Sequence, residues 1–169
     1  MTHPPSAREQ TRRTIFAEDL KTGVEYNLGT YLVTAEEIAD FASSWDPQEF
    51  HVDHVAARDS FFGHVVASGI HTLAVFQKLT VESHLWDWNV MAGRGIRDIR
   101  FRRPVTANDR LAGRFVIDQI NTDSRGRAAV TSMGTLHNQN GQLVLEVTTE
   151  ALVQTREYDK TRDNRSRRR

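Results

Sequence analysis

The segment SGIHTLAVFQKLTVESHLW, residues 68–86, restricts the possible folds more than any other part of the chain. It predicts a long helix whose first three turns carry apolar side chains on nearly every face. A helix with this pattern is normally buried rather than laid on a surface. Its apolar side chains are Ile70, Leu73, Ala74, Val75, Phe76 and Leu79. The rest of the chain must therefore supply a layer that wraps around a helix.

The second half of the chain changes to the two-residue period of β-strands. Strands are predicted at residues 96–105, 110–120, 127–138 and 143–153. The turn-forming stretches DSRGR (123–127) and NQNG (138–141) separate the last three, and Asn-Gly strongly favours a hairpin. In the first strand, one face is predicted to carry Ile99, Phe101 and Val105, and the other Arg100 and Arg102. In the last, one face is predicted to carry Leu143, Leu145, Val147, Ala151 and Val153.

The first half predicts a strand over residues 24–33 and a helix over 34–45, where Thr34 and Glu37 have the spacing of a capping box. The apolar side of that helix is predicted to carry Ile38, Phe41, Ala42 and Trp45. Pro47 ends it, and a short helix capped by Asp53 follows at 53–60. This order is not a strict alternation of strands and helices, so a doubly wound parallel sheet is disfavoured. The chain is expected to be a single α+β domain, an antiparallel sheet wrapped around one long central helix.

Composition excludes several classes of protein. The chain has no cysteine, which rules out disulfides, thiolate catalysis and Cys-ligated metals and fits a cytoplasmic location. No apolar run of about 18 residues is present, so no membrane span is predicted. The last ten residues, KTRDNRSRRR, carry six basic side chains and one acidic one. Such an end can attract nucleic acid, but without aromatics or periodicity it favours a disordered, solubilising tail, so nucleic-acid binding is not expected.

Candidate chemistry is concentrated in WDPQEFHVD, residues 45–53. Asp46 precedes His51 by five positions, and the bulky Trp45 and Phe50 flank them. The pair could be an acid and a base in an apolar cleft, or two residues of an ordinary loop, and the spacing alone favours the loop. The stretch HVDH (51–54), with His64 and His71 nearby, matches no established ligand spacing, so neither a metal site nor a cofactor is predicted.

Joined to GHVVASGIHTLAVF (63–76), this stretch resembles the MaoC-like dehydratases, the hydratase 2 or R-specific enoyl-CoA hydratase branch of the hot-dog fold. Their signature can be written D-x-N-P-x-H, followed by a glycine and by A-S-G at the head of the central helix. Asp46 and His51 match the acid and the histidine, and Gly63 matches the glycine. Residues 67–69 match A-S-G, and FRRPVTANDRL (101–111) is similar to a later strand and turn. Gln48 and Glu49 depart from the signature, although many family sequences have glutamine at the first of these positions.

The resemblance implies a hot-dog domain over residues 14–155, between a flexible arm at 1–13 and a basic, disordered tail at 156–169. It implies reversible hydration of a 2-enoyl thioester of CoA or acyl carrier protein to a 3-hydroxyacyl thioester, in a homodimer or higher homo-oligomer. Asp46 and His51 would activate water, and the Gly69 amide would accept the enolate charge. The expected substrate-binding residues are Gly63, Ser68, Phe50 and Arg103. Two alternatives stay open, a hot-dog thioesterase and a non-catalytic subunit that binds acyl thioesters.

Overall fold

The computed structural model describes residues 15–85, 87–158 and 160. Five strands form one antiparallel sheet in the order β1-β3-β4-β5-β2. They are β1 (Glu25–Leu32), β2 (Val90–Phe101), β3 (Arg110–Thr122), β4 (Arg127–His137) and β5 (Leu143–Gln154). The two predicted hairpin turns join β3 to β4 and β4 to β5, and the two strands flanking the helical segments, β1 and β2, form the edges of the sheet.

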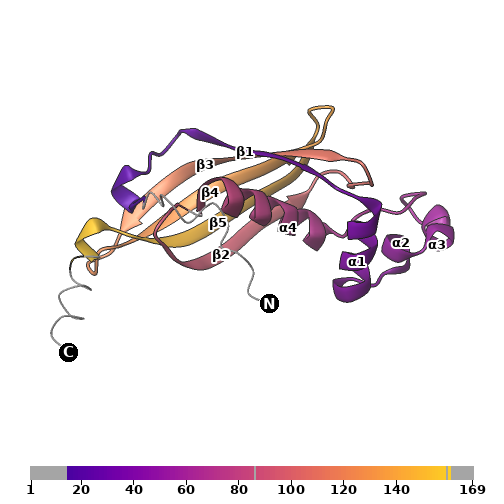
Figure 1. Cartoon of the computed structure of the whole chain (residues 1–169), viewed down its shortest axis with the longest axis horizontal. Coiled ribbons are helices and arrows are strands. Elements are labelled where there is room, and N and C mark those ends of the chain that lie inside the picture. The colour runs from indigo at the N-terminus through magenta and orange to yellow at the C-terminus, as the bar shows by residue number, and fades with distance from the viewer. Residues whose placement is uncertain (1–14, 86, 159, 161–169) are drawn as a thin grey trace, which may run out of the picture.

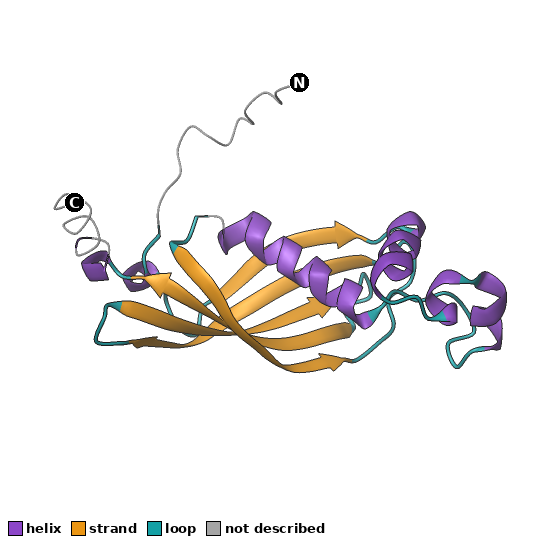
Figure 2. Ribbon diagram, turned by 90° about the horizontal axis from the view of Figure 1, so that it is seen from below, coloured by secondary structure: helices purple, strands orange, loops and turns teal. Residues whose placement is uncertain are grey.

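Four α-helices lie between β1 and β2 in the chain: α1 (Ala35–Trp45), α2 (Glu49–Val52), α3 (His54–Asp59) and α4 (Gly69–Thr80). A short 3-10 helix, η2 (Ala17–Asp19), precedes β1, and a π-helical turn, η3 (Val81–Leu85), follows α4. Helix α4 lies across one face of the sheet, and α1, α2 and α3 extend beyond one end of it (Figures 1 and 2). This is the hot-dog arrangement that the sequence predicts. None of the helices in the described part of the chain is long and apolar enough to span a membrane.

Close contact with the sheet holds α4 in place. Val75, Phe76 and Leu79 on its inner side are buried together with Phe115 of β3. A Cβ atom added at Gly134 of β4 would lie only 2.1 Å from Cζ of Phe76, so only glycine lets the helix approach β4 this closely. Because interiors are packed at near-crystalline density, this contact fixes where the N-terminus of α4 points.

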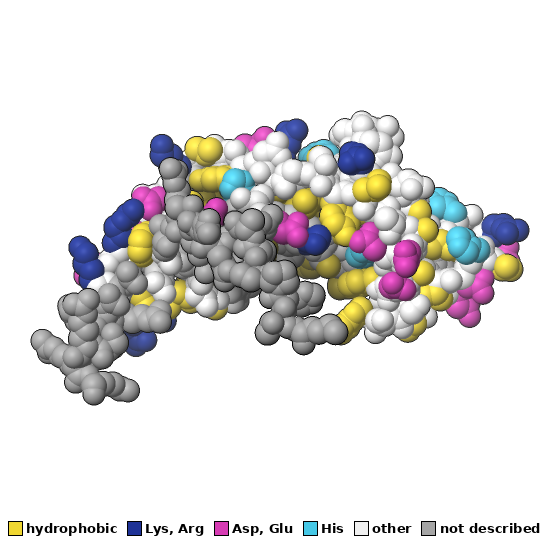
Figure 3. Space-filling view, viewed as in Figure 1, with side chains coloured by type: hydrophobic (Ala, Val, Ile, Leu, Met, Phe, Trp, Pro, Cys, Tyr) yellow, Lys and Arg dark blue, Asp and Glu magenta, His cyan; other side chains and the backbone are white. Residues whose placement is uncertain are grey.

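The opposite side of α4 is open. The predicted burial on nearly all sides is wrong for Ile70, which is 56% exposed, and for Ala74, which is also exposed. One sheet covers only one side of a helix, so the other side keeps its apolar residues at the surface. Figure 3 shows hydrophobic side chains at the surface in the part of the molecule where α4 lies. The α-helix is also shorter than predicted, since the backbone changes to the π-helical turn after Thr80.

Strand β2 differs most from its prediction. It begins at Val90 and ends at Phe101, and its pairing with β5 shifts register three times. Between Arg97 and Arg100 the chain passes through Asp98, whose φ of 54° lies in the left-handed region. A bulge of this kind interrupts the alternation of side chains. The predicted strand over 96–105 also ends four residues early: Val105 is buried beyond it, while Ile99 and Phe101 on the strand are exposed.

The predicted capping box of α1 is confirmed. The Thr34 hydroxyl accepts from the Glu37 amide, and the Glu37 carboxylate accepts from the Thr34 amide, both at 3.1 Å. Asp53 caps α3 as predicted, accepting from the amides of Val55 and Ala56. Trp45 was predicted on the buried side of α1, but it is 77% exposed because the helix has run past the body of the domain at this point.

The predicted arm at 1–13 and most of the predicted tail lie outside the described residues. The guanidinium of Arg156, within the range predicted as tail, donates to Asp19 and stacks over the ring of Phe16. Its amide donates to Glu18 at 3.0 Å. Arg156, predicted to belong to the tail, therefore still packs against η2. The boundaries of the domain remain predictions.

Candidate active site

Asp46 and His51 meet at the junction of α1 and α2. Asp46 is the C-cap of α1, Pro47 ends that helix, and His51 lies in the single turn of α2, within a stretch the sequence reads as a loop. The Gln48 amide donates to the Asp46 carbonyl and the His51 amide to the Gln48 carbonyl, which makes the connection a tight turn. His51 Nε2 and Asp46 Oδ2 are 3.5 Å apart. The turn therefore brings the carboxylate and the imidazole together.

The tautomer of His51 follows from its second contact. Its Nδ1 lies 2.7 Å from the carbonyl oxygen of Val66, and a carbonyl can only accept a hydrogen bond. Nδ1 must therefore carry the proton, which leaves a lone pair on Nε2 in the neutral ring. That lone pair is on the side of Asp46. Because the ring is buried, its orientation is set by the protein and not by solvent.

The Asp46 carboxylate accepts two hydrogen bonds from side chains. Ser68 Oγ donates to Oδ2 at 2.6 Å, and Gln48 Nε2 donates to Oδ1 at 2.8 Å. These bonds, with a smaller contribution from His51, hold the pKa of Asp46 below its ordinary value. Asp46 is therefore a fixed anion. The sequence did not predict this contact of Gln48, although the family signature has Asn, another primary amide, at this position.

A cavity of about 440 Å³ opens beside the pair. Phe50, Phe62, Phe101 and Val105 contribute apolar walls. The Phe50 ring lies 4.4 Å from that of His51, measured between ring centroids. Apolar walls keep bulk water away from the charged atoms and strengthen electrostatic interactions there. Trp45, expected to form such a wall, does not line this cavity.

Gly69 lies in the wall of the same cavity, at the first position of α4. Ser68 caps this helix, and its hydroxyl accepts from the amide of Ile70 at 3.2 Å. The N–H of a first helical residue has no acceptor inside its own helix, and the helix dipole makes this end electropositive. An added Cβ at Gly69 would lie 2.8 Å from Cε2 of Phe101, so a larger residue here would displace that ring or the start of α4. The Gly69 amide is thus a donor on the cavity wall, close in the chain to the Ser68 hydroxyl that binds Asp46.

The structure brings together most of the predicted site residues. Phe50, Ser68 and Arg103 line the cavity, and Arg103 Nη1 also donates to the carbonyl of Leu143 at 3.1 Å. Gly63 is not among the lining residues; it occupies a turn with φ of 72°, and its amide donates to the Ser60 carbonyl. Glu49 begins α2 and is exposed, away from the cavity. Both Glu49 and the proline of the signature suit the first position of a helix, which explains why either is accommodated there.

The histidines considered above as possible metal ligands lie on different elements. His51 lines the cavity, His54 begins α3, and His71 stacks on Phe41 with ring centroids 4.7 Å apart. Within residues 15–85, 87–158 and 160, no group of three His, Asp or Glu side chains could hold a metal ion.

His71 should make stability depend on pH. Its Nδ1 is buried without a hydrogen-bond partner among the described residues, and burial lowers its pKa below 6.5, against an opposing effect of Glu37. The unfolded chain therefore binds this proton first, so the free energy of unfolding should fall as pH drops through and below 6.5. The loss amounts to about 1.4 kcal/mol per unit of pKa difference. Urea unfolding between pH 7.5 and pH 5 measures it.

In that measurement His71→Leu should flatten the pH dependence, whereas His64→Leu, at an exposed position, should leave it in place. An unchanged slope in His71→Leu would contradict the assignment.

Comparison with known proteins agrees with the geometry. The family model of the MaoC-like domain matches residues 17–140. The MaoC-like dehydratase of Rhodospirillum rubrum is 33% identical, with a TM-score of 0.76 over 84% of this chain and 98% of that one. The uncharacterized protein YdeM of Bacillus subtilis (strain 168) is 32% identical over 94 residues, which are 56% of this chain and 67% of that protein.

An (R)-hydratase of A. caviae has the same fold, with 22% identity and a TM-score of 0.63 over 82% of this chain and 98% of that one. The family model covers most of the chain and includes the Asp46–His51 pair and the start of α4. The chain therefore belongs to the MaoC-like dehydratase family.

Proposed function

We propose that the protein catalyses the reversible hydration of a 2-enoyl thioester to a 3-hydroxyacyl thioester. The observation that carries this proposal is the position of three groups on one cavity: the Asp46 carboxylate, the His51 Nε2 lone pair and the Gly69 amide. Hydration of a conjugated double bond needs a base for water and a donor for the enolate oxygen, and this cavity supplies both.

In the hydration direction, a water molecule is held between Asp46 Oδ2 and His51 Nε2. Its oxygen bonds to Cβ of the substrate while a proton passes to Nε2, the atom with the free lone pair. Because its pKa is lowered, the Asp46 carboxylate does not readily accept that proton. As an anion it stabilises the imidazolium that forms on His51. His51 is accordingly the proton acceptor, and Asp46 orients the water and stabilises the charge.

The electron pair of the double bond moves through Cα to the thioester oxygen. The Gly69 N–H, with the helix dipole behind it, receives this negative charge. The enolate then takes a proton at Cα from the imidazolium, which restores neutral His51. Dehydration follows the same path in reverse.

The carrier end of the substrate needs cationic contacts for its phosphates. Arg103 lies at the cavity, is exposed and already uses one guanidinium nitrogen to bind a backbone carbonyl. A guanidinium held this way can present its other donors to a phosphate. We assign it to the phosphate groups of CoA or of the phosphopantetheine arm.

One experiment separates hydration from the alternatives. Purified protein is mixed with trans-2-enoyl-CoA, and loss of the conjugated thioester absorbance is followed together with free thiol release. Hydration removes the absorbance and releases no thiol. Release of free CoA would instead favour a thioesterase, and binding without either change would favour a non-catalytic subunit.

We also propose that two copies associate along β2, a long strand at the edge of the sheet. Ile96, Ile99 and Phe101 of this strand are exposed, and an exposed apolar edge strand favours pairing with another chain. Sedimentation should show a dimer, and Ile99→Lys should weaken it at least about tenfold. Met133→Lys, at an exposed residue of β4, which is paired on both sides, should not. A monomer at all concentrations would contradict the proposal.

A further inference from the structure

The peptide group between Val66 and Ala67 forms hydrogen bonds on both sides. Its carbonyl oxygen accepts from Nδ1 of His51 at 2.7 Å, and its N–H donates to the carbonyl oxygen of Val105 at 2.8 Å. Val66, Ala67 and Val105 are all buried, so water does not compete for either bond. Because a peptide group is planar and rigid, the acceptor on one side fixes the position of the carbonyl on the other. The orientation of His51 therefore depends on Val105.

A second peptide group continues the same chain of hydrogen bonds. The Val105 carbonyl and the Thr106 N–H belong to one peptide group, and that N–H donates to Oδ2 of Asp109 at 2.8 Å. The Thr106 hydroxyl donates to the same oxygen at 3.1 Å. Three hydrogen bonds and two peptide groups thus connect the His51 imidazole to the Asp109 carboxylate, and in each of these bonds the N–H donates toward Asp109.

Asp109 is itself buried, with 9% of its surface exposed. Its other oxygen, Oδ1, accepts from the side-chain amide of Gln139 at 2.9 Å, and within the described part of the chain no Lys or Arg forms an ion pair with it. Buried aspartates are rare unless they are paired. A turn of this kind needs only a side-chain oxygen, which asparagine also has. The negative charge of Asp109 therefore indicates a role beyond closing the turn.

We propose that Asp109 is a positioning residue for His51 and acts on it through the two peptide groups. Hydrogen bonds in a chain polarise one another, so the negative charge of Asp109 makes the Val66 carbonyl a stronger acceptor. That carbonyl keeps the proton of neutral His51 on Nδ1 and so keeps the lone pair on Nε2, on the side of Asp46. The inference rests on the proposed function, because it takes His51 as the base.

The same polarisation acts when His51 becomes an imidazolium. No proton moves along the chain, because each peptide N–H keeps its own proton and only the charge distribution changes. The ring and the Asp109 carboxylate are at most about 13 Å apart, the length of three such hydrogen bonds and two peptide groups. At an effective dielectric constant of about 20, an attraction over this distance changes a rate by about tenfold.

The test removes the charge of Asp109 and keeps its shape. In Asp109→Asn the amide oxygen can still accept from Thr106, so the turn should form. The kcat for crotonyl-CoA hydration should fall at least about tenfold, while KM stays within about twofold because Asp109 does not line the cavity. A second measurement needs no turnover: in NMR spectra, the resonance of the proton on His51 Nδ1 should move upfield as its hydrogen bond weakens.

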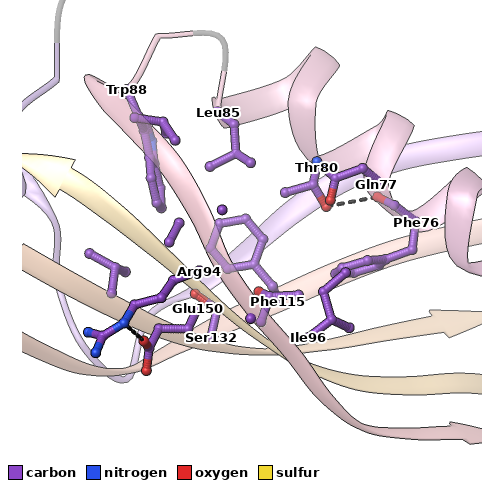
Figure 4. Close-up of a pocket in the computed structure, with 16 residues that line it drawn as sticks. Phe76, Gln77, Thr80, Leu85, Trp88, Arg94, Ile96, Phe115, Ser132 and Glu150 are labelled. Atoms are coloured by element: carbon purple, nitrogen blue, oxygen red, sulfur yellow. Dashed lines mark hydrogen bonds and ion pairs between the residues drawn. The ribbon is translucent and has the colours of Figure 1, made fainter.

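Two matched controls remove a carboxylate elsewhere. Asp123, at the opposite end of β3, also closes a turn, where its carboxylate accepts from two backbone amides at 2.9 Å. Glu150 pairs with Arg94 at 3.1 Å in the wall of a second cavity, of about 450 Å³, whose described lining residues all differ from those of the cavity at His51 (Figure 4). Asp123→Asn and Glu150→Gln should keep the wild-type kcat and the wild-type His51 resonance.

Three results would overturn the proposal. One is a wild-type kcat in Asp109→Asn, and another is a lower kcat with an unmoved His51 resonance, which would leave Asp109 a structural role alone. The third concerns the wild-type protein and so does not depend on how a variant folds. The amides of Ala67 and Thr106 should be strongly protected from hydrogen exchange, and rapid exchange of either would show that the chain of hydrogen bonds is not maintained.

The NMR measurement separates this inference from the proposed function. If no enoyl-CoA reacts with the wild-type protein while the His51 resonance still moves in Asp109→Asn, the proposed function fails and Asp109 still positions His51. If the wild type and Asp109→Asn hydrate crotonyl-CoA equally well and share one His51 resonance, only the role of Asp109 fails.

Discussion

Asp46→Asn should lower kcat for enoyl-CoA hydration by about 10²- to 10⁴-fold, the usual contribution of a positioned acid or base. The amide keeps the size of the side chain but removes the charge that orients water and stabilises the His51 imidazolium. Ser68 and Gln48 donate to different oxygens of the carboxylate, so the NH2 group of the amide faces only one of them. That side chain can rotate to accept a hydrogen bond instead, so the fold should survive. Initial rates and a thermal unfolding curve check both parts.

Glu49→Gln is the matched control, because it makes the same carboxylate-to-amide change three residues away at an exposed position. It should retain wild-type kcat. His51→Ala should match Asp46→Asn, and the double variant should be little worse than either single one, since the two residues act on one water. Full activity in Asp46→Asn would falsify the assignment of this cavity as the active site.

Gly69→Ala should lower kcat by about 10²-fold, because a displacement of about 1 Å at a reacting centre has that effect. The new Cβ would lie 2.8 and 2.9 Å from Cε2 and Cζ of Phe101, so the ring or the start of α4 must move. Stability should change little: alanine is favoured over glycine in a helix by about 1 kcal/mol, which offsets much of a clash of about 1–3 kcal/mol.

A double-mutant cycle tests the cause of that loss. Removing the ring in Phe101→Ala makes room for the alanine methyl group, so Gly69→Ala combined with Phe101→Ala should be at least about tenfold more active than Gly69→Ala alone. Activity of each variant is compared with its melting temperature. If the double variant is as inactive as Gly69→Ala, a clash with Phe101 does not explain the loss.

Local patterns along the chain predicted most elements. The Thr34–Glu37 box, the Asp53 cap and the two hairpin turns each involve residues within a few positions of one another. Such features depend on backbone geometry and on hydrogen bonds between near neighbours, so short windows of sequence suffice to identify them.

The environment of the site was decided by contacts between distant segments. Ser68 donates to Asp46 across 22 positions, His51 is oriented by a carbonyl 15 positions away, and Phe101 of β2 contacts the space beside Gly69 of α4. No period or spacing in the sequence carries this information, because it depends on how α4 docks against α1 and β2.

The exposure of side chains also depended on contacts between distant segments. Trp45 and Ile70 have the spacing of buried residues, yet both are exposed, because helix periodicity says which residues share a face but not what lies opposite it. Near neighbours in the chain were therefore enough to predict most of the helices and strands, whereas α2 was not predicted and the Asp46–His51 pair was singled out only by the resemblance to the family. The register of β2, the open side of α4 and the cavity beside Gly69 required the packed fold, because each is made by surfaces that only meet when distant segments come together.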